Sequence, residues 1–545
     1  MTFADHLIIA PIIIPLFAGG LMLLLDGRRR EALAAISVLS TLALVAVAIA
    51  LLVANMKEDP ASAARVYLLG NWPASFGIVL VADRLAALML LLTATLGCAA
   101  LLFALASWHR VGSYFHPLFQ FLLMGVNGAF LTGDLFNLFV FFEVLLAASY
   151  GLALHGSGRA RVTASLHYIV INLAASTLFL IGVSLIYGTA GTLNMAALGE
   201  HIAALDPSER RLFEIGAAVL GVAFLVKAAA WPLGFWLPTL YAAASAPVAA
   251  LFAIMTKVGV YVILRLGSIT AEAAGGASVF FAEGWLFGIG VATICFASIG
   301  MLASQDLGRL AGYNVLVSSG TMLVAVGLGG MEMVSAALFY LVSSTLTIAA
   351  FFLLVELVER GRTPADDVLA VTLEVYGEEE EEDAEEADEV GIAIPAIMAM
   401  LSVSFLACAL LLSGLPPLSG FIAKFAILNN LLNQYSLAGG GTISPQGWIL
   451  LCVVLVSGLA TIIALTRAGI RTFWTFPERE LPHVRSIELS AVGLLLFLCV
   501  GLTVQAGPVM QFMEKTARGL ELNRPYITAV QAQPRIAPKK TEHAP

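Results

Sequence analysis

The stretch AVLGVAFLVKAAAWPLGFWLP (residues 218–238) begins as a membrane-spanning helix and then departs from that pattern twice. Lys227 lies within the apolar run, and Pro232 and Pro238 follow shortly after it. Ionisable side chains inside a membrane span are expensive and usually face a partner or a water-filled path. Proline removes an amide donor and clashes with the preceding turn. The helix is therefore expected to break just after a buried charge.

The composition of the whole chain also indicates a membrane protein. Of its 545 residues, 60% are hydrophobic and 12% are charged, whereas soluble proteins carry about 25% charged residues. We therefore expect an all-α polytopic membrane protein with about 14 transmembrane helices, since about 20 apolar residues cross a bilayer. The predicted spans are 7–25, 32–54, 84–106, 114–131, 135–154, 164–187, 213–230, 241–264, 278–302, 310–328, 332–356, 393–433, 448–469 and 487–506.

The basic residues of the loops divide unevenly between the two sides of the membrane. Thirteen lie in loops that alternate onto one side and six on the other, leaving out the C-terminal tail. Cytoplasmic loops carry an excess of Lys and Arg, so the first side is predicted to be cytoplasmic, with both termini outside. The thirteen are Arg28, Arg29, Arg30, Arg110, Arg159, Arg161, Arg309, Arg360, Arg362, Arg467, Arg471, Arg479 and Arg485, and the six are Lys57, Arg65, Arg84, Arg210, Arg211 and Arg265.

Motifs for cofactor chemistry are missing from the sequence. The five cysteines all lie in apolar runs and form no CxxC pair, which disfavours iron–sulfur, zinc and disulfide sites. No predicted strand leads into a glycine-rich phosphate loop, so no nucleotide cofactor is expected. We predict no cofactor, no nucleic-acid partner and contact with membrane lipid, and the sequence leaves a metal site open.

Four charged side chains fall within predicted spans. Lys227, Lys257 and Lys424 belong to no loop or tail, and Glu143 lies in mid-span in FNLFVFFEVLLAASYGLAL. Lys227 is the predicted partner of Glu143, and at an effective dielectric of about 20 and a separation of about 5 Å such a pair contributes roughly 3 kcal/mol. Making or breaking that pair would load or unload a proton. The alternative is that each lysine stem carries its ammonium to the interface, which suits Lys257 best if its span begins late.

Two predicted spans are interrupted in matching positions. Pro232 follows Lys227 in the seventh span, and Pro416 and Pro417 divide the twelfth. Broken helices in corresponding places of two halves indicate inverted repeats and a transport site. We therefore predict discontinuous helices 7 and 12 and two inverted five-helix repeats. The expected division is 1–110 (three helices), 111–266 (helices 4–8), 276–475 (helices 9–13, with an acidic cytoplasmic insertion at 364–391), 486–507 (the last helix) and 508–545 (a polar tail).

The acidic insertion contains EEEEEDAEEADE (residues 378–389), in which ten of twelve residues are acidic. Such a run repels itself and is expected to be a solvated, disordered segment. A role in gathering cations is the less favoured alternative.

At these embedded charges the sequence resembles the antiporter-like subunits of respiratory complex I, membrane-bound hydrogenases and Mrp-type multisubunit Na+/H+ antiporters. The resemblance covers nearly the whole chain and rests on FFEVLLAASYGL, LVKAAAWPLGFWLP, SAPVAALFAIMTKVGVYVILRL and SGLPPLSGFIAKFAIL. Within that family the segment KAAAWPLGFWLP is most similar to the D-type subunit of Mrp antiporters. The resemblance implies a proton path from Glu143 and Lys227 through Lys257 to Lys424, inside a complex with Mrp subunits A, B, C, E, F and G in a bacterial cytoplasmic membrane.

One departure from the family concerns the eleventh span. Complex I relatives often carry histidine and lysine there, whereas YLVSSTLTIAAFFLL offers Ser343, Ser344, Thr345 and Thr347. Ser344 and Thr345 are predicted to support the path, although hydroxyls do not hold a proton as a base does. The step from Lys257 to Lys424 would therefore need water.

Three functions compete at this point. The first is a proton-translocating subunit of a multisubunit Na+ or other monovalent cation/H+ antiporter, which is a transporter and not an enzyme. The second keeps the proton channel but assigns it to a redox complex of the complex I or hydrogenase type. The third is an inert scaffold or a quinone-site subunit, which gives no reason for three buried lysines. We also expect the cation to cross mainly in another subunit or at an interface, because Glu143 beside a lysine is a poor cation site.

Overall fold

The computed structural model describes residues 5–56, 64–74, 77–271, 283–360, 396–437, 444–473, 482–522 and 524–532. Within these residues the chain is almost entirely helical, with one short two-stranded antiparallel sheet. The acidic run at 378–389 lies outside the described residues. The three 3-10 helices are η1 (Asp5–Leu7), η2 (Leu69–Asn71) and η3 (Trp108–Arg110).

Each of the fourteen predicted spans corresponds to a helix or to a broken helix, so the predicted fold class is confirmed. Eleven helices of the described residues are long and apolar enough to cross a membrane. The other three spans correspond to the shorter apolar helices α1 and α4 and to α8, whose first turn is charged. The helices up to residue 271 are α1 (Ala10–Leu24), α2 (Arg30–Met56), α3 (Arg84–Ala104), α4 (Phe115–Leu131), α5 (Leu135–Ala153), α6 (Arg159–Ala190), α7 (Met195–Ala204), α8 (Pro207–Lys227), α9 (Trp236–Ala243), α10 (Ala246–Phe252) and α11 (Met255–Ala271).

Both predicted breaks are present. The seventh span is interrupted between α8 and α9, and the twelfth between α16 and α17. The eighth span also breaks, between α10 and α11, just before Lys257, and this third break was not predicted. The helices after residue 282 are α12 (Glu283–Ala303), α13 (Leu307–Leu328), α14 (Met331–Glu359), α16 (Ala396–Ser413), α17 (Ser419–Leu437), α18 (Pro445–Phe473), α19 (Ser486–Val504), α20 (Ala506–Leu522) and α21 (Arg524–Gln531).

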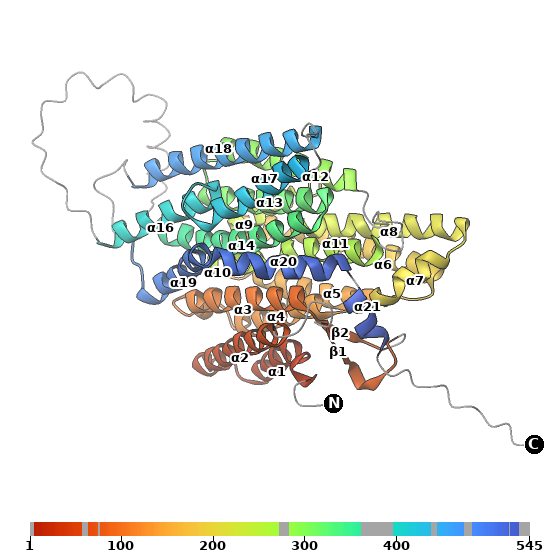
Figure 1. The fold of residues 1–545 in the computed structure, drawn as a ribbon. Coiled ribbons are helices and arrows are strands. Elements are labelled where there is room, and N and C mark those ends of the chain that lie inside the picture. Colours follow the sequence, from red (N-terminus) through yellow and green to blue (C-terminus); the bar gives the residue numbers. More distant parts are fainter. Residues whose placement is uncertain are drawn as a thin grey trace, which may run out of the picture.

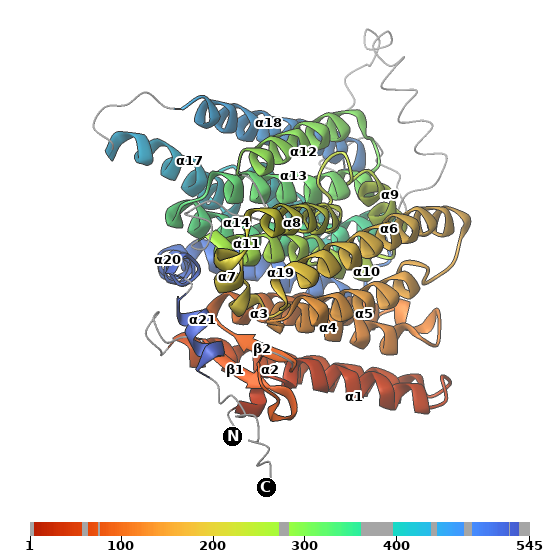
Figure 2. The same cartoon turned by 90° about the vertical axis from the view of Figure 1, so that its right-hand side faces the viewer.

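The spans are arranged roughly in chain order across the molecule (Figures 1 and 2). Helices α1 and α2 lie at one end and α18 lies at the other, while α19 and α20 return to the middle. Helix α14 is the central element: it contacts α10, α13, α16, α17, α19 and α20. Nearly all of its side chains are buried, which explains why it reads as a continuous apolar run.

Contacts between loops support the alternation of sides that the sequence predicts. On the side with the arginine-rich loops, Arg161 Nε donates to the carbonyl of Ala243 at 2.7 Å. On the other side, Asn430 Nδ2 donates to the carbonyl of Glu332 at 2.7 Å. Helix α9 therefore ends on the first side and α17 ends on the second, so the two broken helices run in opposite directions.

The face opposite the arginine-rich loops carries small elements that a search for apolar spans does not find. Strands β1 (Arg65–Leu68) and β2 (Val79–Ala82) pair in antiparallel register, with Arg65 opposite Ala82. Helix α21 packs against both strands and against α7, and η1 packs against β1. Helices α20 and α21 lie within the stretch predicted as a polar tail. They alternate polar and apolar side chains, so their mean hydropathy is low and the spans alone did not reveal them.

Several helix ends are set by short polar side chains. Asp134 caps α5, where its Oδ1 accepts from the amides of Phe136 and Asn137 at 2.8 and 2.9 Å. Asp306 caps α13 and Asp83 caps α3 in the same manner. These carboxylates satisfy amides that would otherwise lack partners in the first turn. Apolar side chains such as Phe17, Leu166 and Leu455 remain exposed on outer helices, as expected of a surface that faces lipid.

Candidate functional site

Lys227 is the last residue of α8 and its ammonium is buried against a neutral partner. Its Nζ donates to Oδ1 of Asn172 on α6 at 3.0 Å and lies 5.6 Å from the centroid of the Phe142 ring. The side chain is 7% exposed, so Lys227 does not extend to the interface. An amide oxygen holds the ammonium without adding a charge of its own.

Glu143 lies close enough to Lys227 to interact with it electrostatically, although no direct salt bridge joins them among the described residues. Oε1 of Glu143 is buried and has no hydrogen-bond partner in the described part of the chain. The hydroxyl of Tyr150, two turns further along α5, is in the same condition. Buried polar atoms are almost always paired with protein or water. Glu143 and Tyr150 therefore form a polar region on α5, close to Lys227.

The break after Lys227 exposes backbone groups that α12 and α13 bind. Ser319 Oγ donates a hydrogen bond to the freed carbonyl of Ala228, and the amide of Trp231, next to Pro232, donates to Thr293 Oγ1 at 2.9 Å. The residue between them, Ala229, has a positive φ of 54°. Side chains of the second half of the chain thus stabilise the broken helix of the first half.

Lys257 lies in the first turn of α11 and is fully buried, at 0% exposure. Its Nζ donates to Oγ of Ser318 on α13 at 2.6 Å. The alternative that this lysine reaches the membrane interface is therefore wrong. Gly259, close by on the same helix, brings α11 against the first break: a Cβ there would lie 2.6 Å from the amide nitrogen of Ala228. The end of α8 at Lys227 and the start of α11 near Lys257 are therefore packed together through Gly259.

Hydroxyl groups continue the row beyond Lys257. Ser318 Oγ and Ser344 Oγ are 2.8 Å apart, which joins α13 to α14, and Ser343 Oγ and Ser419 Oγ are 2.9 Å apart, which joins α14 to α17. Thr345, predicted to support the path, instead donates to the carbonyl of its own helix at Leu341, at 2.6 Å. Successive residues point about 100° apart around a helix, so Ser343, Ser344 and Thr345 cannot all face the same neighbouring helix.

A small cavity lies between the two serine pairs. Its lining includes Asn314, Ser318, Tyr340, Ser343, Ser344 and Leu412. The cavity therefore contacts α13, α14 and the end of α16, which carries the second helix break. All of these lining residues belong to the second predicted repeat, and Ser318 also accepts from Lys257 of the first.

Lys424 is held by the second broken helix. Its Nζ donates to the carbonyls of Leu412 and Ser413 at 3.1 and 2.8 Å, and these carbonyls are free because α16 ends there, before Pro416 and Pro417. Gly414 makes room for the lysine stem: its φ is +79°, and a Cβ at this position would lie 2.5 Å from Lys424 Cδ. The prolines act on the lysine indirectly, by freeing its acceptors.

Four polar residues of this row were not predicted from the sequence. Asn172, Ser318, Ser319 and Ser419 each contact a lysine, a helix break or another serine of the row. The available signal was hydroxyls inside apolar spans, as in VLVSSGTMLV (residues 315–324). That signal is weak because a Ser or Thr in a helix commonly bonds its own backbone, as Thr345 does.

A charged network lies on the side of the molecule that carries the arginine-rich loops. The Glu356 carboxylate accepts from Trp108 Nε1 at 2.8 Å and pairs with Arg360 at 2.6 Å. Arg360 also pairs with Glu488, which is almost fully buried, at 2.8 Å. Trp108 and Glu356 line a larger cavity together with Arg161. Because the carboxylates already have cationic or donor partners, this network is a structural clamp between η3, α14 and α19.

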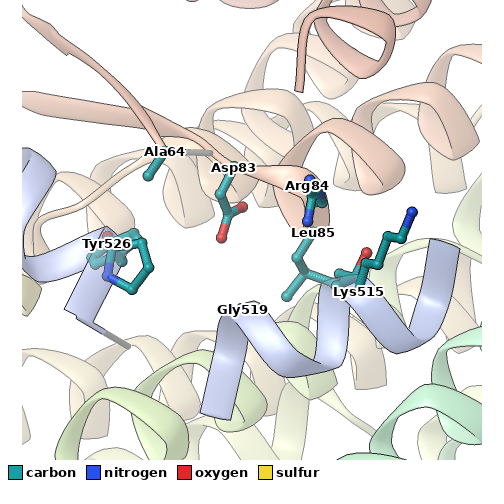
Figure 3. A pocket seen from close by; sticks show the side chains of 9 residues that line it. Ala64, Asp83, Arg84, Leu85, Lys515, Gly519 and Tyr526 are labelled. Atoms are coloured by element: carbon teal, nitrogen blue, oxygen red, sulfur yellow. The ribbon is translucent and has the colours of Figure 1, made fainter. Parts of the chain in front are cut away.

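The opposite face carries a second charged cluster, of which Figure 3 shows Asp83 and Tyr526. Arg265, in the second half of α11, forms two hydrogen bonds with Asp83, at 2.6 and 2.8 Å. The guanidinium also lies 5.1 Å from the centroid of the Tyr526 ring. Asp83, Lys515 and Tyr526 line a pocket between the start of α3 and helices α20 and α21. The cluster ties the C-terminal helices to the transmembrane bundle and lies apart from the lysine row.

Comparison with known proteins identifies the family in which this arrangement occurs. Residues 132–444 match the family described as NADH:quinone oxidoreductase/Mrp antiporter, TM. A relative from Rhizobium meliloti, the D-type subunit of a probable K(+)/H(+) antiporter, is 57% identical over 95% of this chain and 96% of its own. The D-type subunit of a Na(+)/H(+) antiporter from Alkalihalophilus pseudofirmus is 33% identical over 94% of this chain and 97% of its own.

Solved structures share the fold at lower identity. A chain of the Mrp complex from Dietzia superposes with a TM-score of 0.80 at 24% identity, and the match covers 97% of this chain and 100% of that one. A chain of respiratory complex I from Thermus thermophilus gives a TM-score of 0.71 at 22% identity, covering 94% and 99%. The family match spans more than half of the chain, and the first relative is similar over nearly its full length. This chain therefore belongs to the NADH:quinone oxidoreductase/Mrp antiporter transmembrane family.

Proposed function

We propose that this chain is the proton-translocating subunit of a multisubunit monovalent cation/proton antiporter of the Mrp type, corresponding to the D-type subunit. The observation that carries the proposal is the row of three buried lysines, each at or near a helix break. The names of the relatives agree with it, since one belongs to a K(+)/H(+) antiporter and another to a Na(+)/H(+) antiporter. The cation to test is therefore either K+ or Na+.

The partners of the lysines suit groups that gain and lose a proton. Lys227, Lys257 and Lys424 bind an amide oxygen, a hydroxyl and backbone carbonyls. None of the three pairs directly with a carboxylate among the described residues. A fixed carboxylate partner would lock an ammonium in its charged form, whereas desolvation disfavours that form. Neutral acceptors leave both protonation states accessible.

Glu143 supplies the field that biases this exchange. It is close enough to interact electrostatically with Lys227 without holding it by a direct bond. A small movement of α5 or α8 would change that Coulomb interaction, which is worth a few kcal/mol at an effective dielectric of about 20. Such a movement loads or unloads the first lysine, and Lys257 and Lys424 then pass the proton onward.

The architecture of the repeats is part of the proposal. Residues 111–266 and 276–475 form two five-helix units of opposite orientation, preceded by three helices at 1–110 and followed by the last span at 486–507. The opposite directions of the two broken helices support this division. Fixed sites at broken helices between such units are typical of secondary transporters.

The cellular arrangement follows from the same charges. We place the chain in a bacterial cytoplasmic membrane with the arginine-rich loops in the cytoplasm and both termini outside. Its partners are the other Mrp subunits A, B, C, E, F and G, and the exchanged cation crosses mainly in one of them or at an interface. The chain is a transporter subunit and not an enzyme.

The test is cation/proton exchange by the complete complex in everted membrane vesicles from an antiporter-deficient strain. Addition of KCl or NaCl should collapse a respiration-generated pH gradient in the wild type, and Lys227→Ala should abolish that collapse while the complex still assembles. Lys515→Ala, at an exposed lysine of α20, is the matched control and should exchange normally.

Two outcomes would overturn the proposal. Full exchange in an assembled Lys227→Ala complex would remove the lysine row from the path. No collapse in the wild type with K+, Na+ or Li+ would favour the remaining alternative, a proton channel in a redox complex. In that case redox subunits should co-purify with this chain.

A further inference from the structure

Among the described residues, the cavity between Lys257 and Lys424 is lined by no lysine, histidine or carboxylate. This inference rests on the proposed function and concerns how a proton crosses from one half of the chain to the other. Lys257 belongs to the first repeat and donates to Ser318 of the second. Lys424 lies beyond α14, where it is held by the carbonyls of Leu412 and Ser413. Any proton path between Lys257 and Lys424 must therefore pass α14.

Serine hydroxyls reach across α14 from both sides. Ser344 meets Ser318 of α13 at 2.8 Å, and its sequence neighbour Ser343 meets Ser419 at 2.9 Å. Ser419 is the first residue of α17, the helix that carries Lys424. All four serines are buried. The two hydrogen-bonded pairs are therefore connected through Ser343 and Ser344, which are adjacent residues of α14.

The cavity already described lies between these serines and Leu412, whose carbonyl accepts from Lys424. It is lined by Ser318, Ser343 and Ser344 on one side and by Leu412 and Gly420 on the other. Leu412 supplies a carbonyl to which Lys424 donates. The space is on the order of one water molecule, and a water is stable in such a site when it has two to four polar partners. The serine oxygens, Asn314 and Tyr340 offer them.

We propose that the proton crosses between the two halves through these serine hydroxyls and water held in their cavity, with no lysine, histidine or carboxylate carrier in the middle of the eleventh span. The Lys257 ammonium gives a proton to Ser318 Oγ as the hydroxyl proton of Ser318 moves to Ser344. A proton of Ser344 moves to the cavity water, and a proton of that water moves to the neutral Lys424 amine. Every oxygen ends with the number of protons it began with, and only the two lysines change charge.

A hydroxyl is suited to this relay because it donates and accepts at once. It does not retain the extra proton, so transfer is completed only when Lys424 is neutral and able to receive it. The crossing therefore couples the two lysines: Lys257 cannot discharge forward while Lys424 is charged. The hydroxyls and the water must then rotate back before the next proton passes.

The experiment compares two substitutions of nearly equal shape at one position. Ser344→Val and Ser344→Thr place similar volume in the cavity, but only Thr keeps a hydroxyl. In the complete complex in everted vesicles, Ser344→Val should exchange at least about tenfold more slowly than the wild type, equivalent to about 1.4 kcal/mol in the barrier. Ser344→Thr should stay within about threefold. Ser318→Val and Ser318→Thr form a second pair that decides the matter if Ser344→Val does not assemble.

Ser335→Ala is the control for removing a buried serine hydroxyl elsewhere on α14. Its Oγ bonds the carbonyl of Glu332 in its own helix, at 2.8 Å, so exchange should be unchanged. Equal losses in the Val and Thr variants would show that packing matters and the hydroxyl does not. Normal exchange in the Val variants would show that protons cross elsewhere. If Lys227→Ala is inactive while the Val variants are active, only this crossing fails; if Lys227→Ala is active, the proposed function fails.

Discussion

Replacing Gly414 by alanine should move the Lys424 ammonium without changing any ionisable group. Gly414 has a φ of +79°, and a Cβ there would lie 2.5 Å from Lys424 Cδ and 3.1 Å from its Cε. Carbon atoms in contact prefer separations of about 3.5–4.0 Å. The lysine stem must therefore retreat by about 1 Å, because the Cβ itself is fixed to the backbone.

That retreat weakens two hydrogen bonds. Lys424 Nζ is now 2.8 Å from the carbonyl of Ser413 and 3.1 Å from that of Leu412, and a shift of about 1 Å takes both past useful length. A hydrogen bond to a charged group contributes about 1.5–3 kcal/mol, and misplacing a reacting group by about 1 Å can lower a rate about a hundredfold. Gly414→Ala should therefore slow cation-dependent proton exchange by about tenfold to a hundredfold.

The control separates this displacement from backbone strain. Gly191, at the end of α6, has a φ of +68° and a ψ of 3°, and nothing lies within 4 Å of the place that a Cβ would occupy. Alanine there bears a left-handed cost of about 1–2 kcal/mol but contacts no lysine. Both variants are compared in everted vesicles at equal amounts of assembled complex. Gly191→Ala should remain within about threefold of the wild type, and equal losses in the two variants, or none in either, would refute the reasoning.

Two further substitutions probe the partners of the charged groups. Asn172→Leu keeps the size of the side chain but removes the acceptor of Lys227, which leaves a buried ammonium without that hydrogen bond. Cation-dependent proton exchange should fall at least about tenfold. Normal exchange in an assembled complex would contradict the role of Asn172. Asp83→Asn retains a residue able to cap α3 but breaks the buried pair with Arg265, a change that costs about 3–5 kcal/mol. The purified complex should unfold at a lower temperature, which thermal denaturation in detergent measures, and an unchanged transition would show that the pair contributes little.

Much of the candidate path was predictable because a charged residue inside an apolar run, which is costly to bury, can be recognised in the sequence alone. Lys227, Lys257 and Lys424 stand out since a lysine within an apolar run is rare, and the prolines beside two of them indicate broken helices directly. Glu143 was recognised for the same reason. It lies close enough to Lys227 to interact with it electrostatically, as the predicted pairing requires. The sequence did not show that Asn172 accepts the hydrogen bond of the Lys227 ammonium, because it does not show which way a helix face turns.

The neutral members of the row could not be identified in this way. Ser318, Ser344 and Ser419 look the same in sequence as Thr345, whose hydroxyl bonds its own helix. Whether a hydroxyl faces a neighbour depends on the rotation and packing of both helices. Helices α20 and α21 escaped notice for a related reason, since an amphipathic helix has no long apolar run.

The sequence by itself determined that the chain crosses a membrane many times, where two of its helices break and which charges lie at depth. These follow from local physics, because the bilayer requires long apolar runs and proline acts on its own helix. Only the tertiary structure decided which groups those charges meet. Lys257 finds Ser318 and Lys424 finds the carbonyls of another helix through contacts between segments 61 and 11 or 12 residues apart. Such pairings depend on how helices pack, and packing is a property of the whole fold.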